Sequence, residues 1–86
     1  MELSVISRII NEWDPIDLFP AAPKDEYDGE INKISSFITN NKIITSLKLA
    51  NIIHDVFIES FGENIFKSSI DECLNVANKL LSNMNK

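Results

Sequence analysis

All three prolines of this chain, Pro15, Pro20 and Pro23, fall between Glu12 and Glu30. Proline lacks a backbone N–H and clashes with the preceding helical turn, so no regular helix continues through this segment. The same segment contains the only Trp, the only Tyr and one of the two glycines. On either side of it, apolar residues recur at helical spacing. We therefore expect helices before and after one irregular, ordered loop.

Apolar residues three, four and seven positions apart predict four amphipathic helices. Thr45 or Ser46 can cap the third helix, and Gly62 can end it in a left-handed conformation. Ser69, followed three residues later by Glu72, predicts a capping box at the start of the fourth. We expect the helices over residues 2–13, 26–40, 45–61 and 70–84, with residues 85–86 frayed.

The predicted fold is all-α, a small four-helix bundle in which residues 1–86 form a single helical domain. A chain of this length buries only about 60–65% of its unfolded surface, which suits one core. We expect Leu18 and Phe19 to point inward from an extended loop over residues 18–24, and Ile65 and Phe66 to cover one end of the core. The residues predicted to be buried are Ile6, Ile10, Trp13, Ile34, Ile53, Phe57, Leu74, Ala77 and Leu81.

The irregular segment is also strongly acidic. Seven acids share it with one base, Lys24, so it holds six net negative charges, whereas the whole chain holds five. An ordinary solvated face mixes both signs, and a one-sign field accelerates association with an oppositely charged partner. We expect Asp14, Asp17, Asp25 and Asp28 to be exposed. The candidate partner-binding residues are Glu12, Asp14, Asp17, Asp25, Glu26, Asp28 and Glu30.

Clustered carboxylates also suggest a calcium site, for which Asp14 with Asp17, or Asp25 with Glu26 and Asp28, would supply oxygen ligands. Neither spacing matches the twelve-residue calcium loop with its glycine and terminal glutamate, so we expect no metal and no cofactor.

Catalysis is not expected either. His54, the only histidine, has no aligned second group, and Cys73 lies on an apolar stripe beside Asp71 and Glu72, where a thiolate is disfavoured. Trp13 and Tyr27 belong to residue types that are enriched in binding hot spots, but both also complete helical stripes. We interpret them as core residues that hold the loop.

Net charge, apolar runs and cysteine content limit the kind of partner and the location that we expect. A net charge of −5 argues against direct nucleic-acid binding, which depends on Lys and Arg. No apolar run reaches the roughly 18 residues of a membrane span, and residues 1–10 lack the pattern of a signal peptide. A single cysteine favours a reducing compartment. We expect a cytoplasmic protein, a monomer or weak dimer, with a basic protein partner.

Two short motifs carry a family resemblance. Trp13-Asp14-Pro15-Ile16 and Asp25-Glu26-Tyr27-Asp28, separated by a proline-containing loop, resemble the YugE-like family of small helical bacterial proteins over roughly residues 1–60. In that family glycine commonly follows the first motif, whereas this chain has Asp17. The resemblance implies an all-helical fold, and similar small acidic domains act as immunity proteins beside bacterial toxins.

The function that we expect is that of an immunity-type inhibitor, which binds a basic toxin domain such as a nuclease with the acidic loop. A nuclease cleft is basic because it binds phosphates, so an acidic inhibitor complements it. A helical adaptor or regulator with no toxin partner is the alternative, and the surface of the third and fourth helices is the alternative interface.

Overall fold

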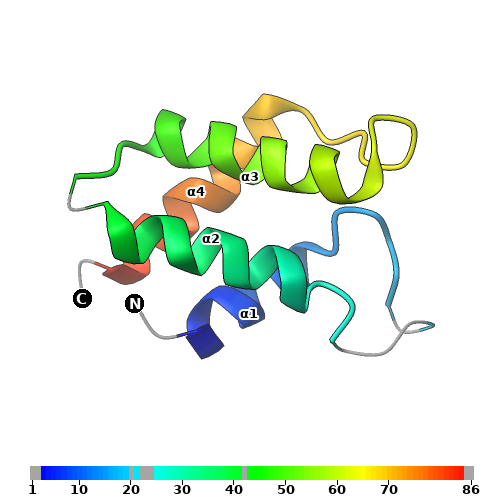
Figure 1. Ribbon diagram of the computed structural model, residues 1–86, viewed down its shortest axis with the longest axis horizontal. Coiled ribbons are helices and arrows are strands. Elements are labelled where there is room, and N and C mark those ends of the chain that lie inside the picture. Colours follow the sequence, from blue (N-terminus) through cyan, green and yellow to red (C-terminus); the bar gives the residue numbers. More distant parts are fainter. Residues whose placement is uncertain (1–2, 20, 22–24, 42, 85–86) are drawn as a thin grey trace.

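The computed structural model describes residues 3–19, 21, 25–41 and 43–84, and these form a four-helix bundle (Figure 1). No strand occurs within the described ranges. The all-α fold predicted from the helical spacing is therefore confirmed. Pro20 and residues 22–24, where the rest of the extended loop was predicted, lie outside the described residues, as do residues 85–86. The helices are α1 (Leu3–Trp13), α2 (Asp28–Asn40), α3 (Ser46–Phe61) and α4 (Ile70–Met84).

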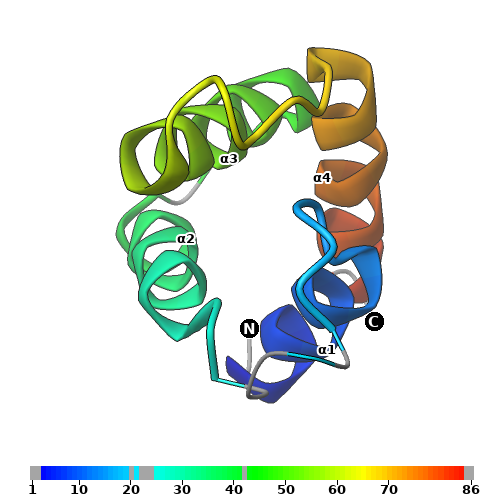
Figure 2. The same ribbon diagram turned by 90° about the vertical axis from the view of Figure 1, so that its right-hand side faces the viewer.

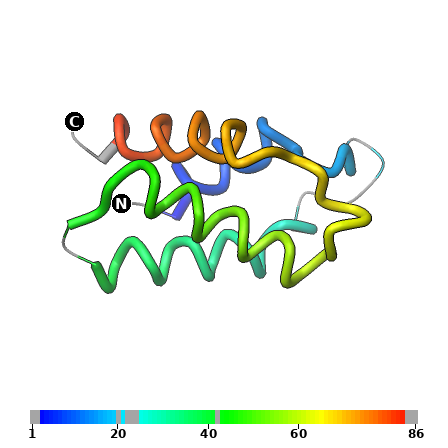
Figure 3. Tube along the Cα trace, turned by 90° about the horizontal axis from the view of Figure 1, so that it is seen from above, coloured from blue at the N-terminus to red at the C-terminus, as the bar shows by residue number. Residues whose placement is uncertain are grey.

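Successive helices run in opposite directions around a ring. Viewed along the bundle, α1, α2, α3 and α4 follow one another, and α4 packs against α1 to close the ring (Figure 2). This up-and-down order places the α1–α2 and α3–α4 connections at one end of the molecule and the short α2–α3 connection at the other (Figure 3).

Three helix ends carry the capping residues predicted for them: the start of α3, the end of α3 and the start of α4. The Thr45 hydroxyl accepts a hydrogen bond from Lys48 N–H at 3.2 Å, and the Ser69 hydroxyl accepts one from Glu72 N–H at 3.2 Å. Each satisfies an N–H that has no partner within the helix. Gly62 ends α3 with a φ of 79°, a conformation that favours glycine.

The start of α2 differs from the prediction by two residues. Asp25 to Tyr27 form a separate turn, closed by Asp28 N–H donating to the Asp25 carbonyl at 3.1 Å. Tyr27, with φ −97° and ψ 7°, leaves the helical region. The helix therefore begins at Asp28 rather than at Glu26, because the backbone turns where the Tyr27 side chain enters the core.

Aromatic rings fill the core near the end that carries the two longer connections. Phe57 stacks on Phe66 at 5.2 Å between ring centroids and on Phe61 at 6.0 Å, while Trp13 meets Phe57 edge-on at 5.5 Å. Phe66 is buried as predicted, but Ile65 is 58% exposed, so the prediction that it covers the core is wrong. The two side chains diverge in the turn that follows Gly62, and only the Phe66 ring reaches Phe57.

Most of the predicted core is confirmed. Trp13, Leu74 and Leu81 are half-buried and pack against the core rather than lying inside it. Leu18 and Phe19 also pack against it, as predicted for the inward side of the loop. No helix in the described part of the chain is both long and apolar enough to cross a membrane. The predicted core residues that are buried are Ile6, Ile10, Ile34, Ile53, Phe57 and Ala77.

Candidate functional site

Asp14 ends α1 and begins a tight turn. Its N–H donates to the Ile10 carbonyl at 2.9 Å, and its own carbonyl accepts Asp17 N–H at 3.0 Å. Its φ of 46° lies in the left-handed region, which aspartate tolerates better than most residues. Pro15 takes the second position of the turn, where its fixed φ is suitable. A tight turn therefore follows α1 directly.

Two residues accept every backbone N–H from Ile16 to Phe19. Ile16 N–H donates to the Tyr27 hydroxyl at 3.3 Å, and Asp17 N–H to the Asp14 carbonyl. Leu18 N–H donates to Asp14 Oδ1 at 2.9 Å, and Phe19 N–H to Asp14 Oδ2 at 3.1 Å. Successive N–H groups that converge in this way form a concavity for an anion. Here the anion is the side chain of Asp14 itself.

The Tyr27 hydroxyl donates to Asp14 Oδ1 at 2.7 Å and so connects the two sequence motifs. The ring is fully buried and lies edge-on to Phe19, Phe57 and Phe61, with centroids 5.5 to 6.2 Å apart. Burial raises the pKa of Tyr27, and the hydrogen bond to Asp14 raises it further. The interpretation of Tyr27 as a core residue that holds the loop is confirmed.

The prediction that Asp14 is an exposed charge is wrong. Its carboxylate is partly buried, and the internal hydrogen bonds take up both of its oxygens. Burial alone would raise its pKa, but the hydrogen bonds from Tyr27, Leu18 and Phe19 outweigh that effect and lower the pKa. Asp14 therefore shapes the loop, and it contributes little to a surface that a partner could contact.

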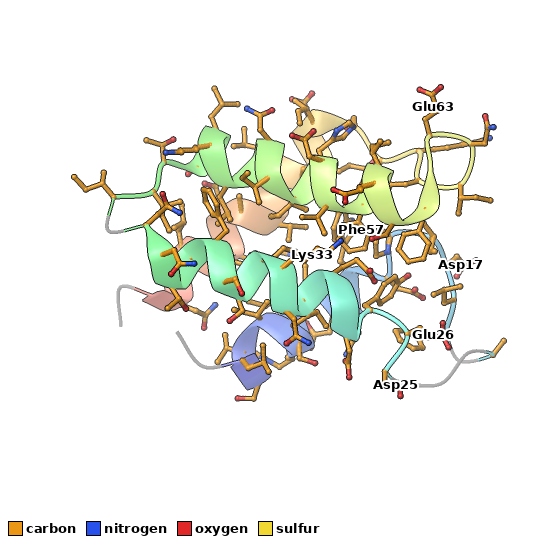
Figure 4. The ribbon with its side chains drawn as sticks, in the orientation of Figure 1. Asp17, Asp25, Glu26, Lys33, Phe57 and Glu63 are labelled. Carbon is orange, nitrogen blue, oxygen red and sulfur yellow. The ribbon has the colours of Figure 1, made fainter. Side chains whose placement is uncertain are left out.

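Three of the predicted acids are exposed at one end of the molecule, Asp17, Asp25 and Glu26 (Figure 4). Glu63, exposed in the α3–α4 connection, lies at the same end and was not among the predicted residues. Its signal in the sequence was indirect, because only the up-and-down order of the helices places the two connections together. We call Asp17, Asp25, Glu26 and Glu63 the acidic end.

The remaining three candidates lie in different surroundings. Glu12 is exposed in the last turn of α1. Asp28 is exposed and lines an open hollow of about 380 Å³ between α1 and α2, together with Ser7 and Asn32. Glu30 is only 8% exposed, so its assignment to a binding face is corrected. It precedes Ile34 by four residues, and this spacing places it on the buried stripe of α2.

One described base, Lys67, lies near the acidic end in the sequence, and it forms no ion pair with the acidic end. Among the described residues, Lys33 pairs with Glu59 at 3.8 Å, and His54 lies 3.8 Å from Asp55, a contact that is an ion pair only when the histidine is protonated. Both acid side chains are more than three-quarters exposed. Such pairs on the surface contribute little free energy. The carboxylates of the acidic end are thus free of ion pairs with any residue that the structure describes.

The structure describes the surroundings of both residues that were weighed for catalysis. His54 is half-buried with its ring edge-on to Phe66, at 5.7 Å between centroids. Cys73 is fully buried, and burial, followed by the nearby Glu72, raises the pKa of its thiol to about 11. Among the residues described, no three His, Cys, Asp or Glu side chains are grouped so that they could hold a metal ion.

A family model for a domain of unknown function (DUF1871) matches residues 5–86, which include both motifs and nearly all of the four helices. The chain belongs to this family. Comparison with curated proteins and with solved structures gives no match. In this DUF1871 domain, Asp17 has a φ of 55°, a conformation that glycine adopts freely. Either residue therefore suits the position after the Trp-Asp-Pro-Ile motif, and aspartate adds a charge.

Proposed function

We propose that this DUF1871 domain is a cytoplasmic immunity-type inhibitor that binds a basic bacterial toxin domain, a nuclease, through its acidic end. The observation that carries the proposal is a set of exposed carboxylates at one end of a four-helix bundle, none of which forms an ion pair with a described cation. Such a surface is complementary to a cleft that binds phosphates, and occupation of that cleft would exclude the nucleic acid.

The Asp14–Tyr27 hydrogen bond supports the proposal. Asp17 belongs to a turn that Asp14 holds, and Asp25 and Glu26 belong to the turn that leads into Tyr27. Carboxylates on ordered turns lose less conformational entropy on binding than carboxylates on a free chain. The acidic end is therefore suited to specific recognition of one partner as well as to general attraction of positively charged proteins.

The test is to produce the protein together with the product of the gene immediately upstream and to purify one of them by a tag. We expect a stable complex, and we expect the partner to cleave nucleic acid only after this protein is removed. The complex should dissociate more readily as salt is raised, because surface charges are screened. A neighbouring product that neither binds nor cleaves nucleic acid would contradict the proposal and favour the adaptor role.

A further inference from the structure

Each of the two sequence motifs forms a turn that is closed by one hydrogen bond. Asp17 N–H donates to the Asp14 carbonyl at 3.0 Å in the first turn, and Asp28 N–H donates to the Asp25 carbonyl at 3.1 Å in the second. The exposed carboxylates occupy defined positions in these turns. Asp17 is the last residue of the first, and Asp25 and Glu26 are the first two residues of the second (Figure 4).

Tyr27 belongs to the second turn and bonds to the first. Its hydroxyl donates to Asp14 Oδ1 at 2.7 Å and accepts Ile16 N–H at 3.3 Å. Its ring is held between Phe19, Phe57 and Phe61, so the hydroxyl cannot move without disturbing the aromatic core. One oxygen atom thus relates the position of the Asp17 turn to that of the Asp25–Glu26 turn.

We infer that Tyr27 is a positioning residue for partner recognition, and that its hydroxyl sets the relative placement of the two acidic turns. The inference rests on the proposed function. Removal of the Tyr27 hydroxyl tests the geometry of the turns separately from their charge, whereas replacement of a carboxylate would alter both. Loss of the hydroxyl removes no carboxylate, so long-range attraction is unchanged, but the two turns no longer hold their carboxylates in the arrangement that fits the partner.

The first measurement needs no partner. In Tyr27→Phe we expect the amide protons of Leu18 and Phe19 to exchange with solvent on the order of tenfold faster, while those of Ile53 and Phe57 stay protected. Asp14→Asn should accelerate the same two loop amides. Asp17→Asn is the matched control, because its side chain is exposed, and it should change neither. Unchanged exchange at Leu18 and Phe19 in Tyr27→Phe would overturn the inference, whatever Asp14→Asn does.

The second measurement uses as the probe the product of the gene immediately upstream, which the proposed function expects to be basic. Tyr27→Phe should dissociate from it on the order of tenfold faster, with an unaltered salt dependence of the association rate. Equal dissociation rates for wild type and Tyr27→Phe would overturn the positioning role alone. A wild-type protein that fails to bind the probe would overturn the proposed function as well, and the exchange data would still show whether Tyr27 holds the turns.

Discussion

The carboxylate of Asp14 replaces helical partners that the chain loses where α1 ends. Pro15 stops the helix, and the N–H groups that follow would be without acceptors if Asp14 and Tyr27 did not supply them. The sequence suggested an exposed charge at Asp14, whereas the structure gives its carboxylate this capping role. The contact with Tyr27, thirteen residues later, determines that the Asp14 carboxylate caps the loop rather than facing solvent. Helical spacing does not predict such a contact, because it crosses an irregular loop.

Replacement of Asp14 by alanine should lower the free energy of unfolding by about 2 to 4 kcal/mol. The change removes three hydrogen bonds to a charged group and leaves a buried tyrosine hydroxyl without its acceptor. Asp17→Ala is the matched control, since Asp17 shares the positive φ but lacks those bonds, and it should cost about 1 kcal/mol. Denaturant unfolding of the two variants measures the difference.

The same pair can be compared in acid. The folded pKa of Asp14 lies below its ordinary value of 3.8, so its contribution to stability is present above that pH and is lost as the pH falls through the folded pKa. Wild type and Asp17→Ala should therefore lose stability more steeply below pH 3.8 than Asp14→Ala. Equal losses for the two alanine variants at neutral pH would contradict the role assigned to Asp14.

Replacement of Glu30 should stabilise the fold, in contrast to replacement of Asp14. Its Oε1 is buried without a hydrogen-bond partner in the described structure, so Glu30→Leu should raise the free energy of unfolding by about 1 kcal/mol. Glu72 occupies the same position in α4 but is exposed, and Glu72→Leu should instead lower stability, because only the favourable interaction with the helix dipole is lost. Thermal unfolding that shows the same sign for both changes would exclude this explanation.

At the scale of the helices, the sequence predicted the limits wherever a local signal exists. Thr45, Gly62 and Ser69 each act within three or four residues of their own position, and each takes the predicted role. The start of α2 has no such signal. The acids before it favour an early start, because negative charge interacts well with the helix dipole. The burial of Tyr27 in the core outweighs this effect, so the helix begins only at Asp28.

The two glycines provide a test at this scale, because a Cβ added at either one would meet no atom within 4 Å. Gly29 lies inside α2, so Gly29→Ala should raise the free energy of unfolding by about 0.5 to 1 kcal/mol. Gly62 has a φ of 79°, so Gly62→Ala should lower it by about 1 kcal/mol. Chemical denaturation of both variants checks the signs, and a gain in stability from Gly62→Ala would show that α3 does not need a left-handed end.

On the scale of the whole molecule, the ring of antiparallel helices brings together parts of the acidic surface that are distant in the sequence. Asp17, Asp25 and Glu26 could be predicted as exposed because they lie in one polar segment. Glu63 could not, since its place depends on the direction in which α3 runs (Figure 4). Conversely, the periodicity of α2 could have excluded Glu30, because it shares a stripe with Ile34.

The core depends most on Phe57, whose ring contacts Trp13, Tyr27, Phe61 and Phe66. Phe57→Ala should lower the free energy of unfolding by about 3 to 5 kcal/mol, since the bundle cannot close around so large a void. Ile65→Ala, at an exposed position, should change it by less than about 0.5 kcal/mol. Comparable losses for the two variants in denaturant unfolding would remove Phe57 from the centre of the packing.

The most direct test of the proposed recognition surface is the association rate of charge-reversed variants with the product of the upstream gene, which the proposal expects to be basic, over a range of ionic strength. One variant combines Asp17→Lys, Asp25→Lys and Glu26→Lys at the acidic end. The matched control combines Asp55→Lys, Glu59→Lys and Asp71→Lys on exposed positions of α3 and α4, with the same change in net charge. Asp14 stays unchanged in both, because its carboxylate holds the loop. Circular dichroism confirms that both variants are folded.

We expect the first variant to lose its rapid association and its salt dependence, and the control to keep most of both, because the field near the contact surface governs the encounter. If instead the control lost binding and the first variant associated as fast and as tightly as wild type, the acidic end would be a solvated loop and recognition would lie on α3 and α4.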